Sequence, residues 1–183
     1  MDSDETLMQA FARGDQKAFD MLYARHKGPV FRFILRHVRE QELANELHQE
    51  VWFKLIRAAE AYEAKAKFTT YLYHIANNLL VDHGRRNTTH LQAVSDQYEE
   101  DDTVLASQLN DTLGQAIIED CLALMRAAVQ ALPVVQRDAF VLQQEGGHSL
   151  EAIADITDSN RETIKSRLRF AIKTLREKLR DCL

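Results

Sequence analysis

The sequence predicts an all-α protein, built of two small helical domains joined by a flexible acidic linker, with a helix-turn-helix in the second domain. Apolar residues recur at helical spacings of three and four, and no window shows the alternation typical of a strand. Residues 88–120 contain eight acidic residues but no Lys or Arg, and periodicity is lost over much of this stretch. We therefore expect domains over residues 1–87 and 113–183, joined by a linker over residues 88–112.

The composition is ordinary for a soluble globular protein, with 45 % apolar and 28 % charged residues. The net charge of −5 is concentrated in the middle of the chain, which argues against indiscriminate nucleic-acid binding. The first residues are acidic where a signal peptide would be basic, and no apolar run is long enough for a membrane span. These features predict a cytoplasmic protein that does not insert into membranes.

The two cysteines, Cys121 and Cys182, lie in no CxxC motif and have no His nearby at a metal-ligand spacing. We expect them to be buried or incidental thiols. The sequence also lacks a Gly-rich phosphate loop and any pattern of paired carboxylates or of a nucleophile with its base. It therefore predicts no cofactor, no metal and no catalytic activity.

The amino-terminal half contains four helical patterns. The first runs from about Asp4 to Arg13, and the second begins after Asp15 as N-cap and ends near Gly28. Pro29 suits the first turn of a third helix. A fourth begins near Glu42, and its expected buried face consists of Leu43, Leu47, Val51, Leu55 and Ile56.

The opposite face of this fourth helix combines carboxylates with an aromatic side chain. It carries Glu46, Gln49 and Glu50, together with Trp52 or Phe53. An exposed aromatic residue beside acidic residues suits the docking of a basic protein partner. Trp52 could equally complete the hydrophobic core, so the sequence leaves both interpretations open.

The segment KAKFTTYLYHIANNLLVDHGRR, residues 65–86, predicts a helix whose polar side mixes cations, aromatic rings and amides. Its expected core stripe is Phe68, Tyr71, Leu72, Ile75, Leu79 and Leu80. The mixture suits single-stranded nucleic acid, because cations follow phosphates, rings stack on bases and amides bond to base edges. The alternative, that the tyrosines belong to the core and the Asn pair forms a cap, has equal weight on this segment alone.

Near the carboxyl end, two helical patterns meet across Thr157, Asp158 and Ser159, a gap that fits the corner of a helix-turn-helix. Ser149 is expected to cap the first helix, and Ser159 with Glu162 forms a capping-box pattern before the second. The polar side of the second helix is rich in Arg and Lys. A capped basic helix behind a short corner indicates binding in the major groove of DNA.

Three segments resemble conserved regions of the sigma-70 family of bacterial RNA polymerase sigma factors, in its extracytoplasmic-function (ECF) group. The run from LPVVQRDAF to TIKSRLRFAIKTLREKL resembles the fourth region, ANELHQEVWFKL resembles the polymerase-binding helix, and FTTYLYHIANNLLVDHGRR resembles the minus-10 region. Tyr71 stands where the family's F-x-x-W-L pattern has Trp.

This resemblance implies an initiation subunit that binds core RNA polymerase and promoter DNA, helps to open the duplex, and is often controlled by an anti-sigma factor. The implied polymerase-binding residues are Glu46, Leu47, Gln49, Glu50, Trp52 and Phe53. The implied minus-10 residues are Lys67, Tyr71, Tyr73, Asn77, Asn78, Arg85 and Arg86. The implied minus-35 residues are Arg161, Thr163, Lys165, Ser166, Arg167, Arg169 and Lys173.

The alternative is an operator-binding regulator whose amino-terminal helices form a dimerisation or sensing domain. A helix-turn-helix alone fits both classes equally well. Such a regulator has no need of the cations, aromatic rings and amides between Lys67 and Arg86. That segment favours the sigma factor.

Overall fold

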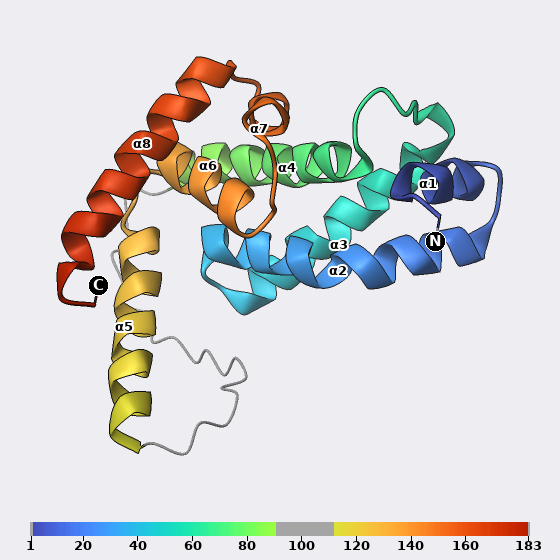
Figure 1. The fold of residues 1–183 in the computed structure, drawn as a ribbon. Coiled ribbons are helices and arrows are strands. Elements are labelled where there is room, and N and C mark those ends of the chain that lie inside the picture. Colours follow the sequence, from blue (N-terminus) through green and yellow to red (C-terminus); the bar gives the residue numbers. More distant parts are fainter. Residues whose placement is uncertain (1, 91–111, 183) are drawn as a thin grey trace.

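The computed structural model describes residues 2–90 and 112–182, with side chains at residues 2–85, 118–180 and 182. Within these ranges all regular elements are helices, which confirms the predicted fold class (Figure 1). The acidic cluster from Asp96 to Asp102 lies outside the described residues. Helical structure reaches His90 on one side and begins at Thr112 on the other, so it enters both ends of the range expected to be linker.

The amino-terminal unit consists of α1 (Asp4–Ala12), α2 (Gln16–Val38), α3 (Gln41–Arg57), the 3-10 turn η1 (Ala59–Ala61) and α4 (Phe68–His90). Asp15 caps α2 as predicted, since its carboxylate accepts a hydrogen bond of 3.0 Å from the backbone N–H of Lys17. Ser3 caps α1 in the same manner through the N–H of Thr6. Side-chain oxygens thus satisfy backbone donors at both helix starts.

The predicted break at Gly28 and Pro29 is wrong, because α2 continues through both residues. An internal proline removes one backbone hydrogen bond and costs roughly 3 kcal/mol. The helix nevertheless continues because its buried residues lie on both sides of the proline: Ala18 and Leu22 before it, Val30, Phe33 and Ile34 after it. Packing of this long apolar face against the other helices outweighs the local preference.

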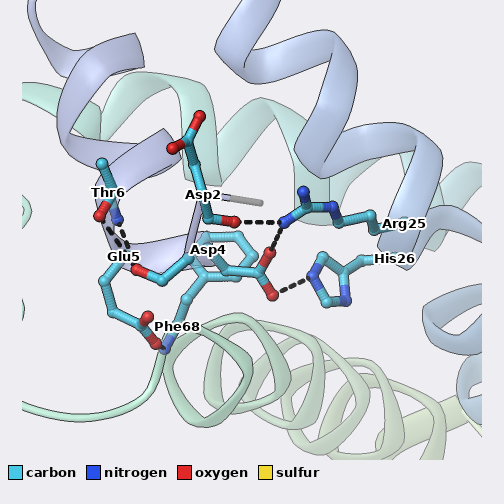
Figure 2. Close-up of polar contacts among 8 residues, drawn as sticks. Asp2, Asp4, Glu5, Thr6, Arg25, His26 and Phe68 are labelled. Carbon is cyan, nitrogen blue, oxygen red and sulfur yellow. Dashed lines mark hydrogen bonds and ion pairs between the residues drawn. The ribbon is translucent and has the colours of Figure 1, made fainter.

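A network of carboxylates joins α1 to α2 and α4 (Figure 2). Asp4 accepts hydrogen bonds of 2.6 Å from Arg25 and 2.7 Å from His26. Glu5 accepts the backbone N–H of Phe68 at 2.8 Å, which satisfies a donor at the start of α4. This bond lowers the pKa of Glu5 below its ordinary value. The network fixes the start of α4 against α1.

The carboxy-terminal unit consists of α5 (Thr112–Gln130), α6 (Val134–Gln144), α7 (Leu150–Ile156), α8 (Arg161–Lys178) and the 3-10 turn η2 (Arg180–Cys182). Helices α7 and α8 form the predicted helix-turn-helix. Ser149 caps α7 as expected, through a bond of 3.2 Å from the N–H of Ala152. Asp158 has a φ of 48° in the corner, a left-handed conformation that Asp adopts more readily than most residues.

The predicted capping box at Ser159 is wrong by one residue. Asn160 is the N-cap of α8, and its side-chain oxygen accepts the N–H of Thr163 at 2.8 Å. Ser159 instead donates to the carbonyl of Thr157 and accepts a hydrogen bond from Arg167. Asn is as good a cap as Ser, so the local sequence permitted either residue.

The expectations about Ile56 and about the cysteines are also wrong. Ile56 of α3 was expected in the buried face but is 39 % exposed. Cys121 and Cys182, expected to be buried or incidental thiols, are joined in a disulfide between α5 and η2. A sequence separation of 61 residues gave no local signal for this pairing.

Candidate protein and nucleic-acid interfaces

The outer face of α3 carries an exposed aromatic ring among polar side chains, as predicted. Phe53 is 58 % exposed, and Ile56, three residues later on the same side, is 39 % exposed. The predicted residues Glu46, Gln49 and Glu50 are exposed on the same face. The surface therefore has a small apolar centre with an acidic side, a combination suited to a basic protein surface that has its own apolar patch.

Trp52 and Leu47 belong to the core and not to this outer face. Trp52 is 4 % exposed, packs edge-on against Phe19 and Tyr23, and donates its indole N–H to the ring of His48 at 3.0 Å. Leu47 is 6 % exposed. The choice between Trp52 and Phe53 is thereby decided in favour of Phe53 as the exposed aromatic residue.

Several of the predicted minus-10 residues fall on one side of α4. Steps of four, three, four and seven residues connect Lys67, Tyr71, His74, Asn78 and Arg85. Lys67 and Arg85 are exposed, whereas Tyr71 and Asn78 are partly buried. We call these five residues the α4 stripe. The side chain of Arg86 lies outside those described.

Tyr73 and Asn77 were expected on this polar surface but are buried, at 5 % and 6 % exposure. Tyr73 packs edge-on between Phe33 of α2 and His148, with ring centroids 5.2 and 4.7 Å away. Burial raises the pKa of its phenol to about 12. Because both side chains are buried, neither the ring of Tyr73 nor the amide of Asn77 is open to a base in this arrangement.

The predicted minus-35 residues are distributed over two sides of α8. Lys165, Arg169 and Lys173 line a shallow hollow of about 680 Å³ with Arg176. Thr163, Ser166 and Arg167 line a smaller hollow of about 400 Å³ beside Phe170, whose ring is 50 % exposed. The first side carries four cations beside Glu177, and the second is mixed, with Arg167 and Glu162 beside Thr163 and Ser166.

Arg161, at the first turn of α8, is held by carboxylates. Its Nε donates to Glu151 of α7 at 2.6 Å, and one terminal nitrogen lies 3.3 Å from Glu162. These partners raise the pKa of the guanidinium still further, with Glu151 the main cause. Arg161 therefore braces the two helices of the helix-turn-helix, and its contact with a base would require it to leave Glu151.

The two units touch through an ion pair between α2 and α6. His37 Nε2 lies 2.6 Å from a carboxylate oxygen of Asp138, and the side chains are only 7 % and 12 % exposed. The other ring nitrogen lies 2.6 Å from the carbonyl oxygen of Phe33. Both ring nitrogens of His37 thus face acceptor oxygens, and the contact with Asp138 is a nearly buried polar contact between the units.

Further polar contacts surround this pair. Arg36 and Glu145 form an ion pair of 3.2 Å that is partly open to solvent. Arg39 donates to the side chain and the backbone carbonyl of Gln130 at 3.0 and 3.1 Å. On the α4 side, His74 lies 3.6 Å from Asp158 in the helix-turn-helix corner. Together these contacts define the closed arrangement, in which α4 packs against α7 and α2 against α6.

His148 lies at the centre of the contact between α4 and the loop before α7. It is 7 % exposed, and its burial, aided by the charge of Lys67, lowers its pKa from 6.5 to about 4. When the pKa of a group is lower in the folded than in the unfolded state, its contribution to stability is complete above the unfolded pKa. That contribution is lost as the pH falls toward the folded pKa. The contribution of His148 to the stability of the folded form is therefore complete above about pH 6.5 and is lost as the pH falls toward 4.

Sequence analysis missed the contact between the units. Arg137 and Asp138 of α6 are buried in the structure, at 7 % and 8 % exposure, and buried charges require partners. In the sequence they stand among the polar residues of α6, and nothing there marks them as buried. No signal marked His37 as the partner either.

The described residues contain no group of three or more His, Cys, Asp or Glu that could hold a metal ion. Among the same residues, no helix combines the length and the apolar character that crossing a membrane requires.

Comparison with known proteins identifies two regions of one family in this chain. The family model of sigma-70 region 2 matches residues 22–89, and that of sigma-70 region 4 matches residues 122–175. The chain is 28 % identical over 186 residues to the ECF RNA polymerase sigma-E factor of Escherichia coli K12, covering 99 % of this chain and 96 % of that one. It is 29 % identical over 188 residues to the RNA polymerase sigma-H factor of Pseudomonas aeruginosa, covering 100 % and 96 %.

Two solved structures show the same fold. The sigma factor RpoE of Bartonella quintana, in complex with the anti-sigma factor NepR, matches with a TM-score of 0.74 and 22 % identity, covering 90 % of this chain and 98 % of that one. CnrH, in complex with the cytosolic domain of CnrY, matches with a TM-score of 0.71 and 19 % identity, covering 98 % and 99 %.

The fold defines the class of all-helical proteins with a helix-turn-helix in the carboxy-terminal unit and a second helical unit before it. The two family matches narrow this class. The chain belongs to the sigma-70 family, in its ECF group. It is a sigma factor, which directs RNA polymerase to promoters in transcription initiation, and not an operator-binding regulator.

Proposed function

We propose that each exposed surface of this sigma factor has its own partner, and that the outer face of α3 binds core RNA polymerase. The supporting observation is Phe53, which is 58 % exposed beside Glu46, Gln49 and Glu50. When a partner covers an aromatic side chain that is this exposed, a large apolar area is removed from water, which favours binding. The acidic neighbours favour a basic partner surface.

The α4 stripe is our candidate for the minus-10 element. Lys67 and Arg85 would follow phosphates, while Tyr71 and Asn78 would meet an unstacked base. Tyr73 and Asn77 act as supports that hold α4 against Phe33 and the rest of the core. This division differs from the sequence expectation, which assigned all of these residues to nucleic acid.

The amino-terminal turns of α8 are our candidate for the minus-35 element. The carrying observation is the cationic side formed by Lys165, Arg169 and Lys173, which stands open beside α6 and α7. A helix of this charge fits the major groove, with its first turns at the base edges and later cations along the phosphates. We propose Arg161, Thr163, Lys165 and Ser166 for base contacts, and Arg167, Arg169 and Lys173 for phosphates.

The closed arrangement must open when both promoter elements are bound. Elements 25 base pairs apart lie about 85 Å from each other along B-DNA, at 3.4 Å per step. In the closed arrangement α4 contacts α7, the first helix of the helix-turn-helix. We propose domain boundaries at residues 1–87 for region 2 and 113–183 for region 4. These two domains would separate when the protein opens.

We also assign this protein to the cytoplasm, where its polymerase partner operates. An anti-sigma factor is a further proposed partner, supported by the two solved relatives, whose structures are complexes with such a factor or with the cytosolic domain of CnrY. It would act by holding the units in a form that cannot reach both promoter elements.

Two substitutions on α8 test the assignment of base and phosphate contacts. In holoenzyme binding to a set of minus-35 sequences, Lys165→Ala is expected to change which sequences are preferred, by roughly 1 to 3 kcal/mol at the affected base pair. Arg169→Ala is expected to weaken binding to all sequences, and to reduce the slope of log affinity against log salt by about 0.9.

Arg13→Ala is the matched control, because Arg13 is an exposed cation in the amino-terminal unit, away from α8. It should leave both sequence preference and salt slope unchanged. If Lys165→Ala and Arg169→Ala reduce binding uniformly, with no change in preference, α8 is only an electrostatic anchor and the base assignment fails.

A further inference from the structure

The disulfide between Cys121 and Cys182 joins the middle of α5 to the turn that follows α8. These are the only two cysteines of the chain. Their Cα atoms lie 5.7 Å apart, within the usual range for a disulfide, so the bond needs no movement of the backbone. Figure 1 shows α5 extending away from the other helices, with the carboxyl end of the chain beside it.

Most of the described side chains of α5 around Cys121 are exposed, and we call residues 118–127 the outer part, or outer half, of α5. Of the residues from Ile118 to Ala127, Cys121 and Arg126 are partly buried and the others are exposed. Buried residues begin at Ala128 and Val129. Ile118, Leu122 and Met125 form an apolar stripe that is 43 % to 51 % exposed. Packing alone therefore holds this half of the helix weakly, and the disulfide supplies its firm attachment to the end of α8.

We propose that Cys121 and Cys182 form a redox modification site, a reversible thiol–disulfide switch that fixes the outer half of α5 to the end of α8. When oxidised, the site holds the apolar stripe in a set position relative to the DNA-reading helix. When reduced, it releases the outer half of α5. Reversibility rests on the proposed cytoplasmic location, because disulfides in that compartment are usually transient and redox-sensing.

The reaction is an exchange with a small-molecule disulfide such as oxidised glutathione. One cysteine thiolate attacks a sulfur of the reagent, forming a mixed disulfide and releasing one thiol. The second cysteine thiolate then attacks the protein sulfur of the mixed disulfide, closing the protein bond and releasing a second thiol. The protein thiols are oxidised by two electrons, the reagent is reduced by two, and the two thiol protons pass to the released thiolates. Both cysteines are partly exposed, which permits the attack.

The test measures alkylation and hydrogen exchange on the full chain in glutathione buffers of increasing oxidised fraction. We expect both cysteines to lose maleimide reactivity together in the monomer, and amides 118–127 to exchange about tenfold faster after reduction with dithiothreitol. Cys121→Ser and Cys182→Ser should exchange at the faster rate in both conditions. Reduced wild type provides the same comparison without a substitution.

Three results would overturn the proposal: cysteines that stay reactive in oxidised buffer, bonds that form between chains, or amides 118–127 that exchange equally before and after reduction. None of these readouts involves polymerase or DNA. A failure here is therefore distinguishable from a failure of the proposed promoter contacts.

Discussion

The variant Phe53→Ala is expected to bind core RNA polymerase at least about 30-fold more weakly than the wild type, a loss of about 2 kcal/mol, as for an aromatic hot spot at the centre of an interface. Phe53 is 58 % exposed on α3, so its removal leaves the core of the amino-terminal unit intact. The loss should therefore appear in the affinity for core polymerase, measured by fluorescence anisotropy, with no change in helicity or melting temperature.

Met21→Ala provides the matched control. Met21 is an exposed apolar residue of α2, at 40 %, outside the three proposed surfaces. It should bind core polymerase as the wild type does. Unchanged affinity of Phe53→Ala, or an equal loss in both variants, would contradict the assignment of the α3 face.

The second large effect is expected at the contact between the units. Asp138→Ala removes the carboxylate that pairs with His37 at 2.6 Å, where both side chains are nearly buried. Breaking a buried ion pair by removing one partner typically costs about 3–5 kcal/mol. Because the pair joins α2 to α6, its loss destabilises the closed arrangement relative to open forms. At about 1.36 kcal/mol for each factor of ten, the ratio of closed to open protein should drop by about 100-fold or more. The radius of gyration from small-angle scattering should rise while helicity by circular dichroism stays constant.

Arg36→Ala is the comparison within the same contact. Its pair with Glu145 is partly open to solvent, and such pairs contribute about 0–1 kcal/mol. We expect little change in the radius of gyration for this variant. A wild-type radius for Asp138→Ala, or equal expansion in both variants, would show that the buried pair does not hold the units together.

Features specified by adjacent residues could be predicted from the sequence. The helix-turn-helix is one example, because Gly146 and Gly147 end α6, Ser149 caps α7, and the corner is too short for other structures. At Gly146, an added Cβ would lie 2.5 Å from the ring of His148, so the glycine also permits that ring to approach the backbone closely. The acidic residues on the outer face of α3, with one aromatic residue beside them, were likewise visible from helical spacing, but the choice of Phe53 over Trp52 needed the structure.

Features that depend on distant residues could not be predicted. Pro29 lies inside α2 because buried residues on both sides extend one packing face, and local preference did not show this. Tyr73 is buried because Phe33 and His148, from elements far away in sequence, pack against its ring. The pairing of Cys121 with Cys182 is of the same kind. Helical periodicity identified α4 but did not tell which of its polar residues would be covered.

Run-off transcription with purified core polymerase tests the central claim most directly, namely that this chain supplies promoter recognition and opening through α4 and α8. Core polymerase with the wild-type protein should give specific transcripts from a promoter carrying both elements, and core polymerase alone should give none. Asn78→Ala should lose transcripts on duplex DNA and recover them on a template melted beforehand at the minus-10 element, where no base has to leave its stack at a cost of a few kcal/mol. Absence of specific transcripts with the wild type, or equal loss of the variant on both templates, would contradict the account.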